Sequence, residues 1–210
     1  MTASRRTIQR LATRQEISNA ATRLFLERGF DSVTVDDIAA AAKVGRMTVF
    51  NHFPRKEDMF FDRTNEVRDM LGKVLREDAA NVSPVEKLRL AAHALVTENS
   101  RYVEFSAESQ RFVEAIKASE SLSARLRGIR AELSQYLAEG FMSGAGAEVD
   151  DAFANLAGAT LLATWTVALT QAHQVFRATQ DQKQAKAAFL EIIDRGSAGL
   201  EVALAGSALI

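Results

Sequence analysis

Side chains that form directional hydrogen bonds are concentrated between positions 46 and 52, where the sequence reads RMTVFNH. An arginine such as Arg46 binds guanine or phosphate, an asparagine such as Asn51 binds adenine, and a threonine such as Thr48 contacts a thymine methyl group or a phosphate. Residues of these types therefore suit the recognition of nucleic acid. The solvated face of an ordinary three-helix domain would carry the same residues, and that alternative stays open on these residues alone.

The spacing of apolar residues predicts that this segment is a short helix with its polar side chains outward. Val49 and Phe53 are four positions apart and share one helical face, and Pro54 prevents the helix from continuing. A helix this short is marginal in water, so neighbouring helices must hold it. The residues left on the outer face are Arg46, Met47, Thr48, Asn51 and His52.

The preceding segment predicts a helix that begins near Val35. The Thr34 hydroxyl is expected to accept the amide of Asp37, and Asp36 and Asp37 favour the positive end of the helix dipole. An apolar stripe follows, made of Val35, Ile38, Ala39 and Ala42. We expect Gly45 to supply the backbone freedom for a turn of three or four residues, so that the two helices form a helix-turn-helix.

A further helix is predicted before these two. Thr13 and Glu16 have the spacing of a capping box, and Gly29 is a natural stop. Its inward face is expected to consist of Ile17, Ala21, Leu24 and Phe25, with Phe30 sealing the small core. Residues 1–12 contain three arginines before this helix. We expect them to form a disordered basic arm that could enter a minor groove or follow the DNA backbone.

Length and composition predict a helical protein with a substantial core. The chain has 210 residues, only two prolines and no cysteine, which excludes disulfides and thiolate metal sites. Residues 1–56 carry ten Lys or Arg against five Asp or Glu, whereas the remainder carries sixteen against twenty-two. A basic small domain on an acidic larger one would present only one end to phosphates. The N-terminus lacks the apolar core of a signal peptide, so we expect a cytoplasmic protein.

Helical periodicity continues after Pro54. One helix is expected to run down to about Asp78, starting at the nucleic-acid end and ending in a second domain, which makes it the element to transmit any signal. Ser83 and Pro84 then mark the next helix start, because serine caps a helix and proline is tolerated in its first turn.

The most apolar helix is expected over residues 153–176. Its central run from Leu156 to Leu169 has no charge, yet this run is shorter than the roughly 20 residues that span a bilayer. One side of the helix can meet the chain's own core. The other side suits close approach to a partner, because it carries the small residues Gly158, Ala159, Ala163 and Ala168.

The stretch from residue 14 to residue 60 resembles the DNA-binding domain of TetR-type transcriptional repressors. It matches the pattern LF…RGF…T…IA…A.V…T.F.HF..K of that family. Carried over onto this sequence, the DNA-binding residues are Thr34, Val35, Gly45, Arg46, Met47, Thr48, Phe50, Asn51, His52 and Lys56. For Lys56 the resemblance implies a phosphate contact at a helix N-terminus. Two residues depart from the family's pattern: Gly45 replaces a frequent hydroxyl residue, which weakens a helix cap, and Phe50 replaces a frequent tyrosine, which removes a contact to phosphate.

Beyond residue 60 the resemblance covers only length and helical layout. It implies a helical domain that surrounds a small-molecule pocket and pairs with a second copy through its last two helices. The pocket candidates are Tyr102, Phe105, Phe112, Tyr136, Trp165 and His173. Most aromatic residues in such periodic runs belong to a packed core, and that interpretation competes with the pocket for each of them.

We therefore predict an all-α protein with an N-terminal three-helix helix-turn-helix domain (residues 1–56) and a larger helical-bundle domain for ligand binding and dimerisation (residues 57–210). The expected function is a ligand-responsive regulator of transcription, with repression as the commoner mode in the family, which binds a palindromic operator as a homodimer. The expected partners are double-stranded DNA, a second copy of the chain and a small hydrophobic effector, with no membrane.

Two other classes of protein stay open. A helical-bundle enzyme would need Glu-x-x-His pairs for a carboxylate-bridged metal, but none of the three histidines has a glutamate three positions before it. The sequence also lacks a nucleophile motif, a phosphate-binding loop and zinc-ligand spacing, so we expect no catalysis, no cofactor and no metal site. A helical protein-interaction module, or an activator without a small-molecule effector, is the other alternative.

Overall fold

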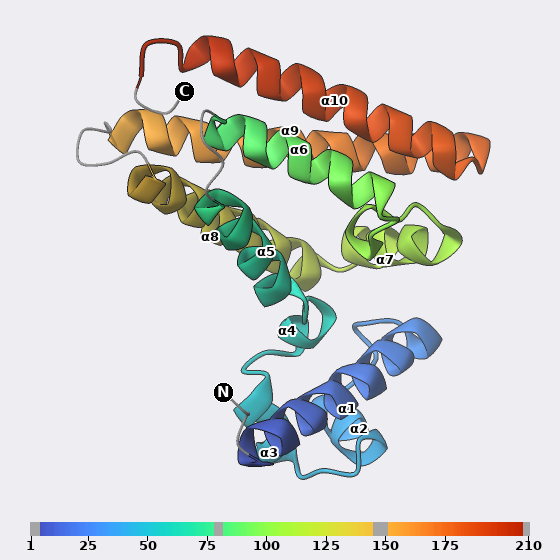
Figure 1. Ribbon diagram of the computed structural model, residues 1–210. Coiled ribbons are helices and arrows are strands. Elements are labelled where there is room, and N and C mark those ends of the chain that lie inside the picture. Colours follow the sequence, from blue (N-terminus) through green and yellow to red (C-terminus); the bar gives the residue numbers. More distant parts are fainter. Residues whose placement is uncertain (1–4, 78–81, 145–150, 208–210) are drawn as a thin grey trace. The chain divides into compact units, whose positions relative to one another are not determined.

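The computed structural model describes residues 5–77, 82–144 and 151–207, and every regular element in these ranges is a helix (Figure 1). By its internal contacts the chain forms two compact units. Unit 1 comprises residues 1–65 and 115–125, and unit 2 comprises residues 66–114 and 126–210. The predicted all-α fold class is confirmed.

Helix α1 (Arg5–Arg28) begins well before the predicted start at Thr13. Residues 5–12 read RRTIQRLA, a sequence with no proline or glycine and with several good helix formers, so the helix extends through them. Thr13 and Glu16 consequently lie inside the helix and cap nothing. The prediction of a disordered arm is therefore wrong for residues 5–12, and residues 1–4 lie outside the described part of the chain.

The core of unit 1 lies between α1 and the helix-turn-helix. Its predicted residues from α1 and the following loop are at most 6% exposed: Ile17, Ala21, Leu24, Phe25 and Phe30. Val49 and Phe53 are fully buried beside them, as their spacing predicted. This shared core provides the neighbours that a seven-residue helix needs for stability.

Helices α2 (Val35–Ala41) and α3 (Arg46–His52) form the predicted helix-turn-helix. The Thr34 hydroxyl accepts the amide of Asp37 at 3.1 Å, and the Asp37 carboxylate accepts the amide of Thr34 at 2.8 Å, which completes a capping box. The turn takes its left-handed residue at Lys43, whose φ is 56°, whereas Gly45 has an ordinary φ of −74°. The expectation that Gly45 supplies the backbone freedom is therefore wrong.

The single helix expected after Pro54 is divided into two. Helix α4 (Lys56–Phe60) is separated from helix α5 (Thr64–Arg76) by a turn of three residues. Within this turn Asp62 accepts a hydrogen bond from the Ser18 hydroxyl of α1. This tertiary contact competes with the local periodicity that predicted a continuous helix. The predicted end near position 78 lies outside the described residues.

A segment distant in sequence completes unit 1. Residues 115–125 belong to it by their contacts, and Leu122 is fully buried in its apolar core. Arg125 forms an ion pair with Asp58 at 2.9 Å, and both side chains are largely buried. The contacts therefore place the division after Asn65 rather than after residue 56, and unit 1 is discontinuous in sequence.

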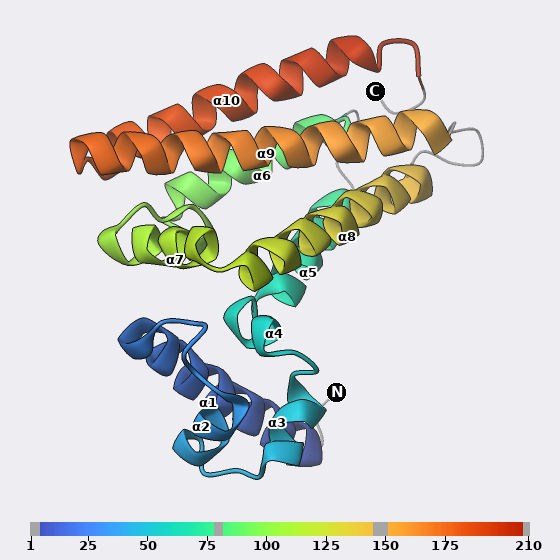
Figure 2. The same cartoon turned by 180° about the vertical axis from the view of Figure 1, so that it is seen from behind.

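Unit 2 is a bundle of longer helices. Beyond α5 its elements are α6 (Pro84–Thr97), the short 3-10 helix η1 (Arg101–Val103), most of α7 (Ala107–Ala118), most of α8 (Glu120–Gly144), α9 (Asp151–Thr179) and α10 (Gln182–Ala203). Helix α6 begins as predicted, because the Ser83 hydroxyl accepts the amide of Glu86 at 3.1 Å. Helices α9 and α10 run side by side, and α6 packs on α10 (Figure 1, Figure 2).

Part of the small-residue face of α9, which was predicted to contact a partner, is buried inside unit 2. A Cβ added at Gly158 would lie 2.6 Å from the carbonyl oxygen of Ser134 in α8, and Ala168 is fully buried. The expectation that Gly158 and Ala168 face a partner is therefore wrong. Ala159 and Ala163 are exposed, so the rest of the predicted face is free in the isolated chain.

Helix α9 is long and apolar enough, by length and composition alone, to cross a membrane. No charged residue occurs between Asp151 and Arg177, a longer run than the predicted Leu156 to Leu169. The core helix of a globular protein passes the same test, and seven residues of α9 are buried in unit 2, among them Leu161 and Phe176.

Candidate nucleic-acid interface

The outer face of α3 is open to solvent. Arg46, Met47 and Asn51 are exposed, Met47 by 70%, while Thr48 and His52 are half-buried. The opposite edge of the helix is buried in the core of unit 1. Helix α3 therefore has the predicted arrangement, in which one edge fixes the helix and the other offers polar side chains to a partner.

Arg46 is held near the first turn of α2. Its guanidinium pairs with Asp36 at 2.7 Å and lies 5.5 Å from the centre of the half-buried Phe50 ring. Both charged side chains are more than half exposed, and such surface pairs contribute only about 0–1 kcal/mol. Arg46 is thus oriented in the free protein, yet it can exchange Asp36 for a nucleic acid at little cost. The local sequence pattern predicted a role for Asp36 at the helix dipole but did not predict this ion pair.

Arg14 fixes the far end of α3, a role that was not predicted from the sequence. Its guanidinium donates to the backbone carbonyl of His52 and lies 3.8 Å from the centre of the Phe53 ring. Burial lowers the pKa of Arg14, and the nearby charges of Asp62 and Asp58 act in the opposite direction. A cation at the C-terminal end of a helix satisfies free carbonyls and complements the dipole. The only sequence signal was the four-residue spacing of arginines along α1.

Lys56 lies at the start of α4 and ties it to the loop after α1. Its ammonium donates to the carbonyls of Phe30 at 2.9 Å and Val33 at 3.0 Å, and it lies 4.2 Å from the centre of the Phe30 ring. An ammonium has three N–H groups, so one is left for another acceptor. The phosphate contact implied by the resemblance stays a prediction, and it would share Lys56 with these structural bonds.

The surroundings of His52 favour its neutral form. Partial burial, followed by the positive charges of Arg14 and Arg10, lowers its pKa below the usual value of 6.5. The imidazole is therefore uncharged at pH 7. It can accept or donate a hydrogen bond at the end of α3, but it adds no net positive charge there.

The remaining candidates lie at the starts of the two helices. Thr34 is exposed, but its hydroxyl is already hydrogen-bonded in the capping box. Val35 is half-buried against the core. Gly45 is the N-cap of α3 and makes no side-chain cap bond, in line with its departure from the family's pattern. A Cβ added there would meet only the Thr48 hydroxyl oxygen, at 3.8 Å, so the site has room for a side chain.

All six pocket candidates lie in unit 2, and three of them share one cluster. Phe105 is buried, and its ring centre lies 5.1 Å from that of His173 and 6.3 Å from that of Phe189. Trp165 packs edge-on against the same Phe189 at 5.6 Å. Gln110 donates to the backbone carbonyl of His173 at 2.6 Å. These residues form an aromatic cluster with polar edges at His173 and Gln110.

The other three candidates have different neighbours. The Tyr102 hydroxyl donates to Glu66 at 2.7 Å, and Phe112 is 41% exposed. The Tyr136 ring is covered by the guanidinium of Arg68, 4.5 Å from the ring centre, and its hydroxyl lies over Gly72. The structure thus brings together half of the predicted set, and the existence of a pocket stays a prediction.

Within the described ranges no three His, Asp or Glu side chains are grouped to hold a metal ion. Two of the histidines have partners in unit 2, since His93 lies 2.8 Å from Asp194 and His173 lies against Phe105.

Comparison with known proteins assigns the N-terminal part of the chain. The family model described as bacterial regulatory proteins, tetR family, matches residues 17–62. The chain is 34% identical over 82 residues to the transcriptional repressor DhaR of Mycobacterium sp. (strain GP1), a match covering 38% of this chain and 41% of DhaR. It is 35% identical over 95 residues to the transcriptional regulator AcrR of Shigella flexneri, covering 42% and 44%. The matched segments thus span less than half of these relatives.

Solved structures extend the likeness of fold to most of the chain. The FadR repressor of Thermus thermophilus, solved with lauroyl-CoA, has a TM-score of 0.54 at 24% identity and covers 89% of this chain and 92% of its own. Salmonella enterica GusR has a TM-score of 0.53 at 23% identity and covers 91% and 95%. The helix-turn-helix geometry and the family match over the same segment lead to one conclusion: residues 17–62 of this chain form a DNA-binding-type domain of the tetR family of bacterial regulatory proteins.

Proposed function

We propose that the protein is a homodimeric, cytoplasmic repressor of transcription that reads a palindromic operator through α3. The observation that carries this proposal is the open polar face of α3, held by a buried edge and by Arg14 at its end. Two such helices in a symmetric dimer would enter successive major grooves about 34–36 Å apart. Repression is inferred from relatives such as the Mycobacterium repressor DhaR.

The residues on α3 have distinct expected roles. Arg46 and Asn51 are expected to read base edges, because their exposed side chains offer the bonding patterns that guanine and adenine complement. The exposed Met47 suits apolar contact with a thymine methyl group. Thr48 and the neutral His52 would bind phosphate or base as hydrogen-bonding groups.

Fluorescence anisotropy with DNA tests this assignment. The probe is a duplex of about 40 base pairs from directly upstream of the protein's own gene, which has room for two half-sites one helical turn apart, and a scrambled duplex is its control. Arg46→Ala should weaken binding to the upstream duplex by about 1–3 kcal/mol and binding to the scrambled duplex far less. Asp36→Asn should tighten binding to both, because it releases Arg46 and removes a negative charge.

Arg23→Ala provides the matched control, because Arg23 is an exposed arginine of α1 away from the α3 contacts. Equal effects of Arg46→Ala and Arg23→Ala on the upstream duplex would contradict base reading by Arg46. A wild-type protein that binds neither duplex would favour the interaction-module alternative, in which the helix-turn-helix is only a scaffold.

The dimer interface is proposed on α9 and α10. Exposed residues recur every three or four positions along the uncharged part of α9, namely Leu156, Ala159, Ala163 and Val167, and Val202 on α10 is 78% exposed. An apolar stripe of this kind must be covered, and two copies of the helix pair can cover each other as a four-helix interface. Sedimentation velocity at micromolar concentration should therefore give a dimer.

A charge in the stripe should separate the copies. Val167→Glu is expected to shift sedimentation toward the monomer, because an unpaired carboxylate would be buried in the interface. Leu90→Glu on α6 is the control, since Leu90 is similarly exposed but lies on another helix. A monomeric wild type, or equal effects of both substitutions, would contradict the interface.

An apolar effector is proposed for the aromatic cluster in unit 2. The solved relatives include FadR with lauroyl-CoA, whose acyl chain is apolar, and SmeT with triclosan, which has two apolar aromatic rings. Trp165 is the only tryptophan, so its emission reports binding at the cluster. An effector should change this emission and lower DNA affinity together, because it stabilises one of two states. No emission change across a panel of apolar compounds that includes these two would favour a regulator without a small-molecule effector.

A further inference from the structure

The first turns of α1 carry a row of arginines that continues away from α3. Arg6, Arg10 and Arg14 are four positions apart and share one face of the helix. Arg14 is bound to the end of α3, whereas Arg6 and Arg10 are exposed and have no ion-pair partner in the part of the chain that the structure describes. Arg10 is near enough to lower the pKa of His52. The row therefore starts at the recognition helix and leads outward from it.

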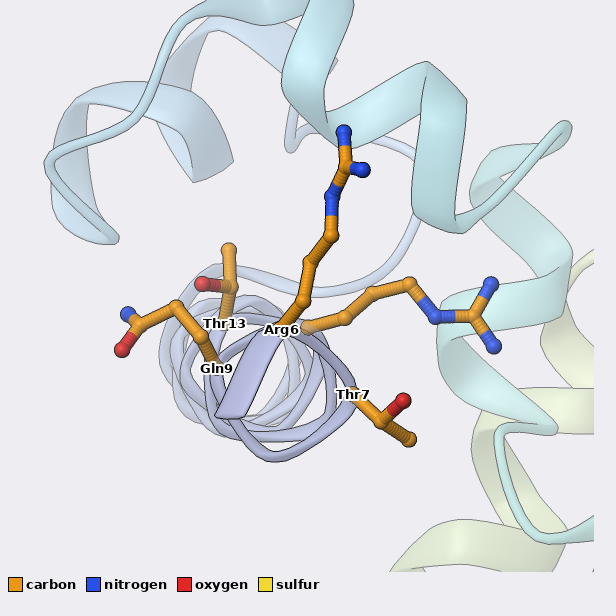
Figure 3. A pocket seen from close by; sticks show the side chains of 5 residues that line it. Arg6, Thr7, Gln9 and Thr13 are labelled. Carbon is orange, nitrogen blue, oxygen red and sulfur yellow. The ribbon is translucent and has the colours of Figure 1, made fainter. Parts of the chain in front are cut away.

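The same face contains a solvent-open depression with a volume of about 490 Å³ (Figure 3). Its lining consists of Arg6, Thr7, Gln9, Arg10 and Thr13. These side chains offer two guanidinium groups, two hydroxyls and an amide, and the lining contains neither a carboxylate nor a hydrophobic residue. A pocket for a small apolar molecule is enclosed and mostly hydrophobic. This surface has instead the groups that proteins use to hold the DNA backbone.

We propose that Arg6 and Arg10, presented on the helical extension of α1, bind phosphates of the same DNA duplex that α3 reads. The proposal rests on the proposed DNA binding and adds a contact site outside the helix-turn-helix. Two observations support it: the row is continuous with the end of α3 through Arg14, and its charge complements a polyanion. The contact carries no base information, so it should strengthen binding to all sequences alike.

The helical conformation of residues 5–12 determines how the two arginines are presented. Residues 5–12 are helical, so Arg6 and Arg10 are spaced by about 6 Å along the axis, at 1.5 Å per residue. Both side chains thereby leave the helix from one face, and each guanidinium can reach a phosphate of the same duplex. A disordered arm with the same arginines would thread along a groove and would not need this register.

Salt-dependent anisotropy measures the contact. The probes are the upstream duplex and its scrambled control, and the variant is Arg6→Gln with Arg10→Gln. Each lost phosphate contact reduces the slope of log K against log salt by about 0.9, so the double variant should lose about 1.8 per bound protomer on both duplexes. The matched control is Arg23→Gln with Arg177→Gln, which removes the same charge from exposed arginines outside the row.

A second pair of variants tests the helix. Leu11→Pro keeps every arginine but breaks the extension, because proline at this interior position removes a backbone hydrogen bond and clashes with the preceding turn. Leu11→Ala is its control, since Leu11 is 55% exposed. Leu11→Pro should lose the same slope as the double arginine variant, and Leu11→Ala should match the wild type, with circular dichroism to follow helix content.

The measured salt slopes distinguish a helical phosphate site from the alternatives. A wild-type slope for the double arginine variant, or an equal loss in the Arg23 and Arg177 control, overturns the phosphate site while DNA binding itself stands. A wild-type slope for Leu11→Pro overturns the helical presentation and indicates a threading arm. A wild-type protein that binds neither duplex overturns the proposed function and the inference together.

Discussion

The two units are held together in different ways. Unit 1 joins its short helices by bonds between a charged or polar side chain and a distant partner: Arg14 to the end of α3, Lys56 to two loop carbonyls, Ser119 to Asp31 and Arg125 to Asp58. Unit 2 also has side-chain bonds between helices, such as His93 to Asp194, but its long helices meet along two apolar clusters and at close helix contacts. Polar chemistry thus orients the first unit, and side-chain size orients the second.

The difference follows from what each unit must leave exposed. Helix α3 has only seven residues and keeps one face open, so bonds at its ends add to the orientation that its buried edge provides. Helix α9 has 29 residues and buries small residues along its length. The comparison predicts that changes of size damage unit 2 most and that changes of polarity damage unit 1 most.

The largest effect is expected from one methyl group in unit 2. Gly158→Ala would place a Cβ 2.6 Å from the Ser134 carbonyl oxygen and 3.0 Å from the Ala138 amide, both of them backbone atoms that cannot rotate away. Overpacking of this kind costs about 1–3 kcal/mol. Urea denaturation should show the loss, and Gly199→Ala on α10, where an added Cβ meets nothing, should be close to wild type. Wild-type stability of Gly158→Ala would mean that α8 and α9 are not so closely packed.

A similar or slightly smaller loss is expected from one charge in unit 1. Lys56→Met keeps the aliphatic stem but removes the bonds to the Phe30 and Val33 carbonyls, and loss of partly buried hydrogen bonds costs about 1–3 kcal/mol. Arg55→Met is the control, because the neighbouring Arg55 is exposed. If the two substitutions lower the free energy of unfolding equally, Lys56 has no special structural role, and the phosphate contact alone would explain any loss of DNA affinity.

A small gain in stability is expected at the N-cap of α3, where no side chain caps the helix. Gly45→Ser adds a hydroxyl at the N-cap of α3, in a site with room for it, and should stabilise the helix by a few tenths of a kcal/mol. Thermal denaturation should show a slight upward shift. Gly45→Ala fills the same space without a cap and is the comparison. A gain for alanine equal to that for serine would assign the effect to the unfolded chain.

The smallest effect is a dependence on pH at the end of α3. The pKa of His52 is lower in the folded state than its usual 6.5, so the unfolded chain binds the proton more readily. Stability is then fully present above pH 6.5 and falls as the pH drops through that value. The urea midpoint between pH 7.5 and 5.5 should decline less in His52→Asn than in the wild type. Identical declines would show that His52 has no part in it.

The sequence predicted structure correctly in both units where the signals were local. Caps at Thr34 and Ser83 and the four-residue spacing of Val49 and Phe53 depend on neighbours in the chain, and the structure confirms them. The start of α1 was missed because the capping-box spacing at Thr13 also occurs inside a helix. Contacts between distant segments, such as residues 115–125 joining unit 1, leave no local pattern in a single sequence.

The candidate sites divide in the same way. The exposed face of α3 was predictable, since amphipathic spacing fixes which residues point outward. The structural bonds of Arg14 and Lys56 were not, because each joins a side chain to a backbone carbonyl more than twenty residues away. Periodicity placed the aromatic residues of unit 2 on helix faces. Only the packing shows that Phe105 and Trp165 both contact Phe189 and that His173 contacts Phe105, whereas the other three candidates have different neighbours.

Hydroxyl-radical footprinting of the upstream duplex tests most directly whether the outer face of α3 reads DNA in two copies. The expected result is two protected patches about one helical turn, 10–10.5 base pairs, apart. Both patches should weaken in Arg46→Ala and persist in Arg23→Ala. A single patch, uniform protection, or patches that Arg46→Ala leaves unchanged would contradict it.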